Sequence, residues 1–171
     1  MDQGIYAIWY ELPESVKPEY MAWFHDVHLP EQLSRPGVLW AAHYELGHGG
    51  QKFQKVVDTL VYGDTAALGR GRGYIALFGG ETAHTFLNPR PDQLRAAQSP
   101  ETRRMLGMRE QVYTSLFAEV TRVDGPDRAR RGPGLTPGPV IQTCSFNVNS
   151  HTNEEEVGSW YVQYRMPFLA S

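Results

Sequence analysis

The chain has 171 residues and a formal net charge of −3, with 41% hydrophobic and 20% charged residues. These values are typical of a globular protein, and the slightly acidic balance predicts no general attraction to nucleic acid. No apolar run approaches about 18 residues and strand-like residues begin near the N-terminus, so we expect neither a membrane span nor a signal segment. We therefore expect a cytoplasmic protein, in which the single cysteine, Cys144, excludes an intrachain disulfide.

The first part of the chain predicts a strand, a helix and a second strand. Residues 5–11 are β-branched and aromatic, as is typical of a strand. Apolar residues recur at three- and four-residue steps over 19–33, which predicts an amphipathic helix. Pro30 lies inside that helix and should kink it or restart its last turn. Residues 38–46 predict the second strand.

The following part predicts a second half of the same design. Residues 73–78 predict a third strand, 82–87 and 91–106 predict helical segments, and 111–123 predict a long fourth strand. This order is that of the α+β ferredoxin-like βαββαβ unit, with one antiparallel sheet and two helices on one of its faces. The glycine-rich stretch 47–73 carries a short apolar patch, which is either a short helix or an extra strand.

The ferredoxin-like domain is thus expected over 1–124, and a linker and a shorter unit follow it. Residues 125–139 hold proline or glycine at about half of their positions, which is typical of a linker. In the last segment, 140–171, residues 140–148 predict a strand and 154–169 predict a helix.

That last segment resembles the start of the chain. A shift of 137 residues aligns Trp23 with Trp160 and Pro30 with Pro167, in the same strand–helix context. Similarity at a fixed offset indicates an internal repeat. The second copy stops after one strand and one helix. Either the natural protein is longer, or this strand and helix pack against another subunit.

The first helix also carries a family resemblance. Its segment 23–31 (WFHDVHLPE), followed by Pro36, Gly37 and Val38, is similar to the dimeric α/β-barrel superfamily, particularly its EthD-like and stress-responsive members. The shared features are an aromatic residue, a helical histidine, a proline, and a Pro-Gly pair before the second strand. The resemblance implies a barrel of two sheets packed face to face, usually in a homodimer. It implies no single activity, because the superfamily spans several enzyme classes and proteins of unknown role.

Alternation along the strands predicts two faces of the sheet. The set containing Ile5, Ala7 and Trp9 is mostly aliphatic and should pack under the helices. The other set is aromatic and should line a pocket for a flat, partly apolar ligand, although the same rings could fill a barrel or dimer core. The expected substrate-binding residues on this second face are Tyr10, Trp40, Tyr44, Tyr74, Phe78, Tyr113 and Phe117.

Three side chains are candidates for acid–base catalysis. Glu119 belongs to the aromatic set, where desolvation would raise its pKa, unless it lies in water at the end of the strand. His28 precedes the helix-breaking proline and could transfer a proton at the barrel mouth, or could orient the following loop. His25 lies three residues earlier on the same flank of the helix. The two histidines could share a metal, but the sequence has no HExxH motif, and we expect neither a metal nor an organic cofactor.

These features favour a small-molecule enzyme that moves protons on an aromatic or polyketide-like substrate, as an isomerase, cyclase or dehydratase does. One alternative is a cofactor-independent monooxygenase of the same superfamily. Another is a non-catalytic ligand-binding or stress-associated dimer. We expect a small-molecule substrate and a homodimer formed sheet to sheet, without nucleic-acid or membrane partners.

Overall fold

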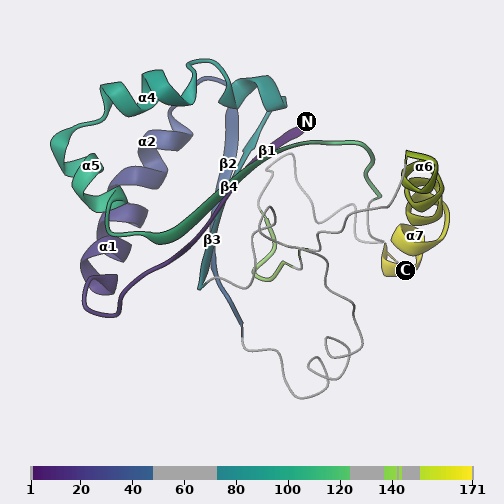
Figure 1. Ribbon diagram of the computed structural model, residues 1–171, viewed down its shortest axis with the longest axis horizontal. Helices are drawn as coiled ribbons and strands as arrows, with labels where there is room; N and C mark the ends of the chain where they lie inside the picture. The colour runs from purple at the N-terminus through teal and green to yellow at the C-terminus, as the bar shows by residue number, and fades with distance from the viewer. Residues whose placement is uncertain (1, 48–72, 124–136, 142, 144–150, 171) are drawn as a thin grey trace. The chain divides into compact units, whose positions relative to one another are not determined.

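The computed structural model of the chain (Figure 1) describes residues 2–47, 73–123, 137–141, 143 and 151–170. The stretch 48–72, most of the expected linker and most of the expected strand at 140–148 lie outside the described residues. The chain divides into two units, Met1–Ala118 and Glu119–Ser171. Each unit is described by itself.

The first unit contains a four-stranded antiparallel sheet in the order β2-β3-β1-β4. This order and the helical connections after β1 and β3 confirm the expected α+β class and are compatible with a ferredoxin-like fold. Strands β1 and β3 are central and mostly buried, whereas the edge strands β2 and β4 are more exposed. The strands are β1 (Gly4–Glu11), β2 (Val38–Glu45), β3 (Tyr74–Gly80) and β4 (Glu110–Ala118).

A continuous helical stretch joins β1 to β2. It consists of α1 (Lys17–Trp23), the π-helical segment η1 (Phe24–His28) and α2 (Leu29–Leu33). The wider π turn ends at His28, two residues before Pro30, which cannot donate a backbone hydrogen bond. We expected Pro30 to kink the helix or to restart its last turn; in the structure a π turn precedes the proline, and the helical stretch continues through it as α2.

The connection from β3 to β4 contains the short 3₁₀ helix η2 (Ala83–Phe86), then α4 (Pro91–Ala97) and α5 (Pro100–Leu106). The helical region predicted over 91–106 thus consists of two helices. The second one begins afresh because Pro100 occupies its first turn and the Ser99 hydroxyl accepts a hydrogen bond from the Thr102 amide at 3.0 Å. Helices α1, α2, α4 and α5 all lie on one side of the sheet (Figure 1).

The register of the central strands corrects the predicted faces. Tyr6 is opposite Phe78 and Tyr10 is opposite Tyr74. The core beneath the helices includes Tyr10, Tyr74 and Phe78, and Tyr6 packs against it. The tyrosines of β1 and the aromatic residues of β3 therefore fill the space between sheet and helices, where the prediction had placed the aliphatic set.

The aromatic residues of the two edge strands lie on the other face. Tyr113 pairs with Trp9, and Tyr44 pairs with Ile75. The same face carries Trp40, which lies over Gly79 so closely that an added Cβ there would be 2.0 Å from the indole. The prediction that all seven aromatic residues share one face is wrong. Alternation separates the residues of one strand into two sets, but it does not determine which set lies on the same face of the sheet as a given set of the neighbouring strand.

The second unit contains another helical stretch, formed by α6 (His151–Trp160), the π-helical segment η4 (Tyr161–Arg165) and α7 (Met166–Ala170). Its π segment begins 137 residues after that of the first unit, and Pro167 follows it as Pro30 follows η1. The described positions 140, 141 and 143 are not in a strand. No described helix has the length and apolar character of a membrane-crossing segment.

Candidate functional site

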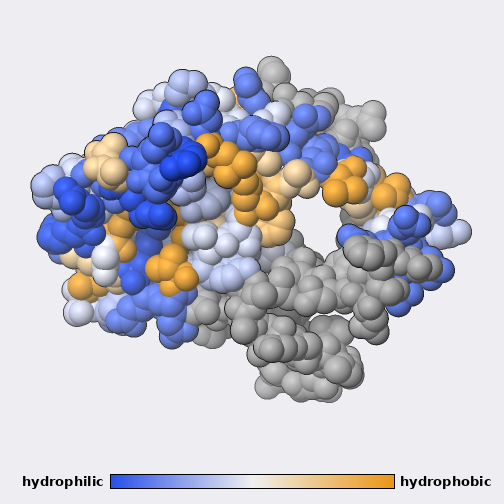
Figure 2. Space-filling view, turned by 45° about the horizontal axis from the view of Figure 1, so that its top comes forward, coloured by the Kyte–Doolittle hydropathy of each residue, from blue (hydrophilic) through white to orange (hydrophobic). Residues whose placement is uncertain are grey.

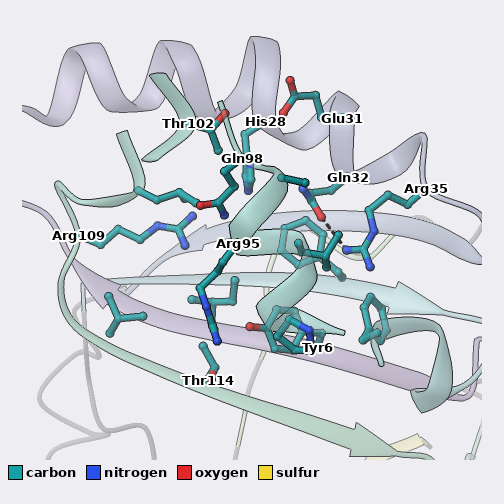
Figure 3. A pocket seen from close by; sticks show the side chains of 18 of the residues that line it. Tyr6, His28, Glu31, Gln32, Arg35, Arg95, Gln98, Thr102, Arg109 and Thr114 are labelled. Carbon is teal, nitrogen blue, oxygen red and sulfur yellow. Dashed lines mark hydrogen bonds between the residues drawn. The ribbon is translucent and has the colours of Figure 1, made fainter. Parts of the chain in front are cut away.

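A cavity of about 700 Å³ lies between the helices and the sheet of the first unit (Figure 3). This volume is within the range of about 300–1,000 Å³ that is usual for small-molecule sites. The cavity lies on the helix side of the sheet, opposite to the face for which a pocket was predicted. Its apolar wall consists mainly of Ile8, Val38, Phe78, Phe86, Leu94 and Val112.

The cavity is accessible because the helices leave part of edge strand β4 uncovered. On the helix side of this strand, Val112 and Leu116 are 50% and 36% exposed, and Thr114 is also exposed. Figure 2 shows hydrophobic side chains gathered among the hydrophilic surface residues of the first unit. The break between α4 and α5 lies beside this opening, since Gln98 and Ser99 both line the cavity.

His28 is the most deeply buried polar group of the cavity wall, with 6% of its surface exposed. Its ring stacks on Trp23 and lies beside Phe24, with centroid distances of 4.9 and 5.4 Å. Its Nδ1 atom is buried and has no hydrogen-bond partner among the described residues. Burial, assisted by the positive charge of Arg109, lowers the pKa of His28 to about 4. The imidazole is therefore neutral at pH 7.

Arg109 lines the same cavity and is held by aromatic rings. Its guanidinium carbon lies 4.5 Å from the centre of the Tyr10 ring, and its Nε donates to the Tyr20 hydroxyl at 2.5 Å. Such cation–π contacts and the hydrogen bond fix the orientation of the group. Its Nη2 atom is buried without a partner, and no described carboxylate forms an ion pair with it. A buried, unpaired guanidinium N–H is a strong donor for an anion.

The remaining charged groups make the cavity electropositive. Arg35 and Arg95 also line the cavity. Among the described lining residues, Glu31 is the one that carries a carboxylate. Arg35 donates to Gln32 Oε1 at 2.9 Å, and burial lowers the pKa of its guanidinium without removing the charge at neutral pH. The lining thus has three guanidinium groups and one carboxylate, and this excess of positive charge favours an anionic ligand.

His25 is turned away from this cavity. Its Nε2 lies 2.9 Å from Nδ1 of His43, whose Nε2 lies 2.6 Å from the Tyr10 hydroxyl. Burial and the neighbouring His25 lower the pKa of His43 to about 4, and burial raises the pKa of Tyr10. Both nitrogens of His43 are thus engaged in hydrogen bonds. Among the described residues, no three histidine, cysteine or acidic side chains are grouped to hold a metal.

The other catalytic candidate, Glu119, is not on a strand. Strand β4 ends at Ala118, and both carboxylate oxygens of Glu119 accept hydrogen bonds from Arg122, at 3.1 and 2.8 Å. The fourth strand is shorter than predicted, so alternation cannot be extended to Glu119. This residue does not line the described cavity.

Of the residues predicted for the site, His28 and Phe78 line the cavity. Tyr10 and Tyr74 are buried in the core, and the four remaining aromatic residues lie on the opposite face of the sheet. Sequence reasoning missed Arg109 and Arg35. Each lies just before a strand, at 110 and 38, but only the fold shows that both reach the cavity that contains His28.

No protein-family model, curated protein or solved structure matches this chain. The fold and the chemistry of the cavity therefore carry the functional argument.

Proposed function

We propose that the protein binds a small organic acid in this cavity and that His28 transfers a proton to or from it. The supporting observation is that His28 and Arg109 line one cavity and that each carries a buried polar atom, Nδ1 and Nη2 respectively, without a hydrogen-bond partner among the described residues. More than about 90% of buried polar groups in proteins have a partner. Two such atoms on residues that line one cavity support the proposal that a ligand pairs with these residues.

In this proposal Arg109 binds the acidic group and His28 acts on a neighbouring atom. The neutral imidazole accepts a proton from a C–H or O–H group that a carbonyl acidifies. The negative charge of the ligand opposes the effect of Arg109 and raises the pKa of His28 from about 4 toward neutrality. The bound ligand would thereby make His28 a stronger base. Enolisation, isomerisation and cyclisation of an aromatic or polyketide-like acid need this chemistry.

A non-catalytic ligand-binding protein is the second candidate. One observation favours it: an imidazole with a pKa of about 4 is a weak base before the ligand is bound. In that case His28 and Arg109 would serve as hydrogen-bonding groups for the ligand, and no proton would be exchanged.

We further propose that the sheet face away from the helices packs against a second copy of the chain, as the resemblance to dimeric α/β barrels implies. The rings of Tyr113 and Phe117 lie 5.7 and 6.3 Å from that of Trp9 on this face, and Phe117 is 45% exposed. The repeated π segment supports an origin of the second helical stretch by duplication. The cytoplasmic location stays part of the proposal.

The catalytic proposal is tested with phenylpyruvate, which joins a carboxylate to a weakly acidic benzylic C–H. In D₂O, His28 would take the benzylic proton while the C–H electron pair moves toward the ketone oxygen, and deuterium would return to the carbon. Proton NMR should show loss of the benzylic signal at least ten-fold faster with the protein than in buffer. His28→Gln should reduce this rate to that of buffer, whereas His84→Gln, at an exposed position outside the cavity, should retain it.

Binding of phenylpyruvate without exchange would favour the non-catalytic candidate. If the protein neither binds this acid nor accelerates its exchange, the proposal is wrong. Equal exchange by wild type and His28→Gln would remove His28 from the mechanism.

A further inference from the structure

The cavity has a guanidinium at each of two opposite sides. Figure 3 shows Arg109 and Arg35 extending into it toward one another, with His28 and Tyr6 placed between them. Neither arginine forms an ion pair with a described carboxylate. A ligand with one acidic group would satisfy only one of them.

Strand β1 gives the scale of this separation. Arg109 lies over the ring of Tyr10, whereas Arg35 interacts electrostatically with Tyr6. These tyrosines are four positions apart on one strand, which corresponds to roughly 13 Å at about 3.3 Å per residue. The two guanidinium groups extend toward one another from these ends (Figure 3), so an aromatic acid with a second acidic group at its far end could bridge them.

Aromatic rings line the sheet side of the cavity between the two arginines, and the polar side chains of Arg95 and Gln98 also lie there. The ring of Tyr6 stacks with Phe78 and Phe86 at centroid distances of 6.5 and 5.8 Å. These three rings and Ile8 all line the cavity. They offer a face on which a planar ligand body can pack, while its polar ends reach the arginines.

We propose that the ligand is a planar molecule with an acidic group at each end, one bound by Arg109 and the other by Arg35. This inference rests on the proposed function and specifies its substrate class. The acidic group at Arg109 is the one near His28, because the charge of Arg109 acts on that imidazole. Proton transfer would occur at this end, and Arg35 would position the molecule from the other end.

The test compares naphthalene-2,6-dicarboxylate with 2-naphthoate, which has the same ring system and a single carboxylate. Isothermal titration calorimetry of the wild type should give at least ten-fold tighter binding of the dicarboxylate. Arg35→Gln should abolish this advantage and leave the affinity for 2-naphthoate unchanged, because Arg109 still holds its carboxylate. Arg103→Gln is the control, since this exposed residue of α5 does not line the cavity.

Two further variants sharpen the assignment. Arg109→Gln should weaken both probes, and its fold is checked by near-ultraviolet circular dichroism; if it does not fold, Arg35→Gln alone decides. Arg95→Gln should retain the preference for the dicarboxylate. Loss of the preference in Arg95→Gln but not in Arg35→Gln would overturn the role given to Arg35.

The results separate this inference from the function on which it rests. Equal affinity of the wild type for the two probes would overturn the proposal that the ligand has an acidic group at each end. The proposed function would still stand if 2-naphthoate binds and the protein accelerates the exchange of phenylpyruvate. If neither naphthalene probe binds, the two-ended ligand is wrong; if phenylpyruvate also neither binds nor exchanges, the proposed function is wrong as well.

Discussion

The hydroxyl of Tyr10 lies 2.6 Å from Nε2 of His43, beneath the helices. Tyr10 is completely buried, and the other ring nitrogen of His43 is hydrogen-bonded to His25. This chain of contacts links β1, β2 and η1. Tyr10 therefore has a structural role in the core, where it also supports the guanidinium of Arg109.

Removal of the Tyr10 hydroxyl should destabilise the fold. Tyr10→Phe leaves a nitrogen of His43 without this partner, at a cost of about 1–2 kcal/mol in the free energy of unfolding. Tyr6→Phe is the matched control, because the hydroxyl of Tyr6 has no hydrogen bond to a described residue. Urea unfolding followed by tryptophan fluorescence measures both variants. Equal losses in the two would contradict the role of the Tyr10–His43 bond.

The free energy of unfolding should decrease as the pH is lowered, because two histidines are buried in their neutral form. The pKa of His28 is lowered from 6.5 to about 4, so the unfolded chain binds a proton before the folded one does. The free energy of unfolding then decreases as the pH falls from about 6.5 toward 4, by about 2 kcal/mol for His28 at pH 4.5. His43, with its pKa lowered to about 4 as well, adds a loss of the same sign over the same pH range.

Urea unfolding at pH 7.0, 5.5 and 4.5 measures this dependence. His28→Gln should flatten the profile, whereas His84→Gln should leave it unchanged, because that side chain is exposed. A stability that rises on acidification, or the same profile in His28→Gln, would show that His28 is not held neutral in the fold.

Arg109 should control the titration of His28. Its positive charge disfavours the imidazolium, so Arg109→Gln should raise the pKa of His28 toward its ordinary value, although burial would still keep it low. The imidazole Cε1–H resonance in proton NMR follows this titration directly. Arg103→Gln should not shift it. An unchanged His28 pKa in Arg109→Gln would show that the two groups do not interact.

The open face of the sheet should mediate dimerisation. Phe117→Lys places a charge among the aromatic rings of that face and should convert a dimer to a monomer in light scattering coupled to gel filtration. Leu33→Lys introduces the same charge at a residue of α2 that is 43% exposed, and should leave the dimer intact. A monomeric wild-type protein would contradict the proposed dimer.

The order of strands and helices could be predicted from the sequence because each element carries a local signal. The alternation near Tyr10 and the periodicity before Pro30 both indicate the observed elements. The sequence could not predict which face of the sheet the helices cover. Ala7 and Tyr10 lie on opposite sides of β1 and both are buried, so hydrophobicity does not distinguish the two faces. The ring of Tyr10 packs in the core on the helix side, whereas that of Trp9 lies beside Tyr113 on the other face.

The site could be predicted only where one residue carried the signal. His28 was singled out because it precedes Pro30 in the predicted helix, and it lines the cavity. Arg109 is 81 residues away in sequence and has no motif around it. Its position depends on Tyr10 and Tyr20, whose ring and hydroxyl contact the guanidinium through tertiary structure.

The most direct test of the cavity as the ligand site uses the tryptophan indole N–H signals in an ¹⁵N-resolved NMR titration with 2-naphthoate. Trp23 stacks on His28 at the cavity, whereas Trp9 and Trp40 lie on the other face of the sheet. The resonances of the Trp23 indole and the His28 imidazole should shift together during the titration, while the indole resonances of Trp9 and Trp40 should not change. Shifts of Trp9 and Trp40 without a change at Trp23 and His28 would contradict the cavity site and place the ligand on the open face.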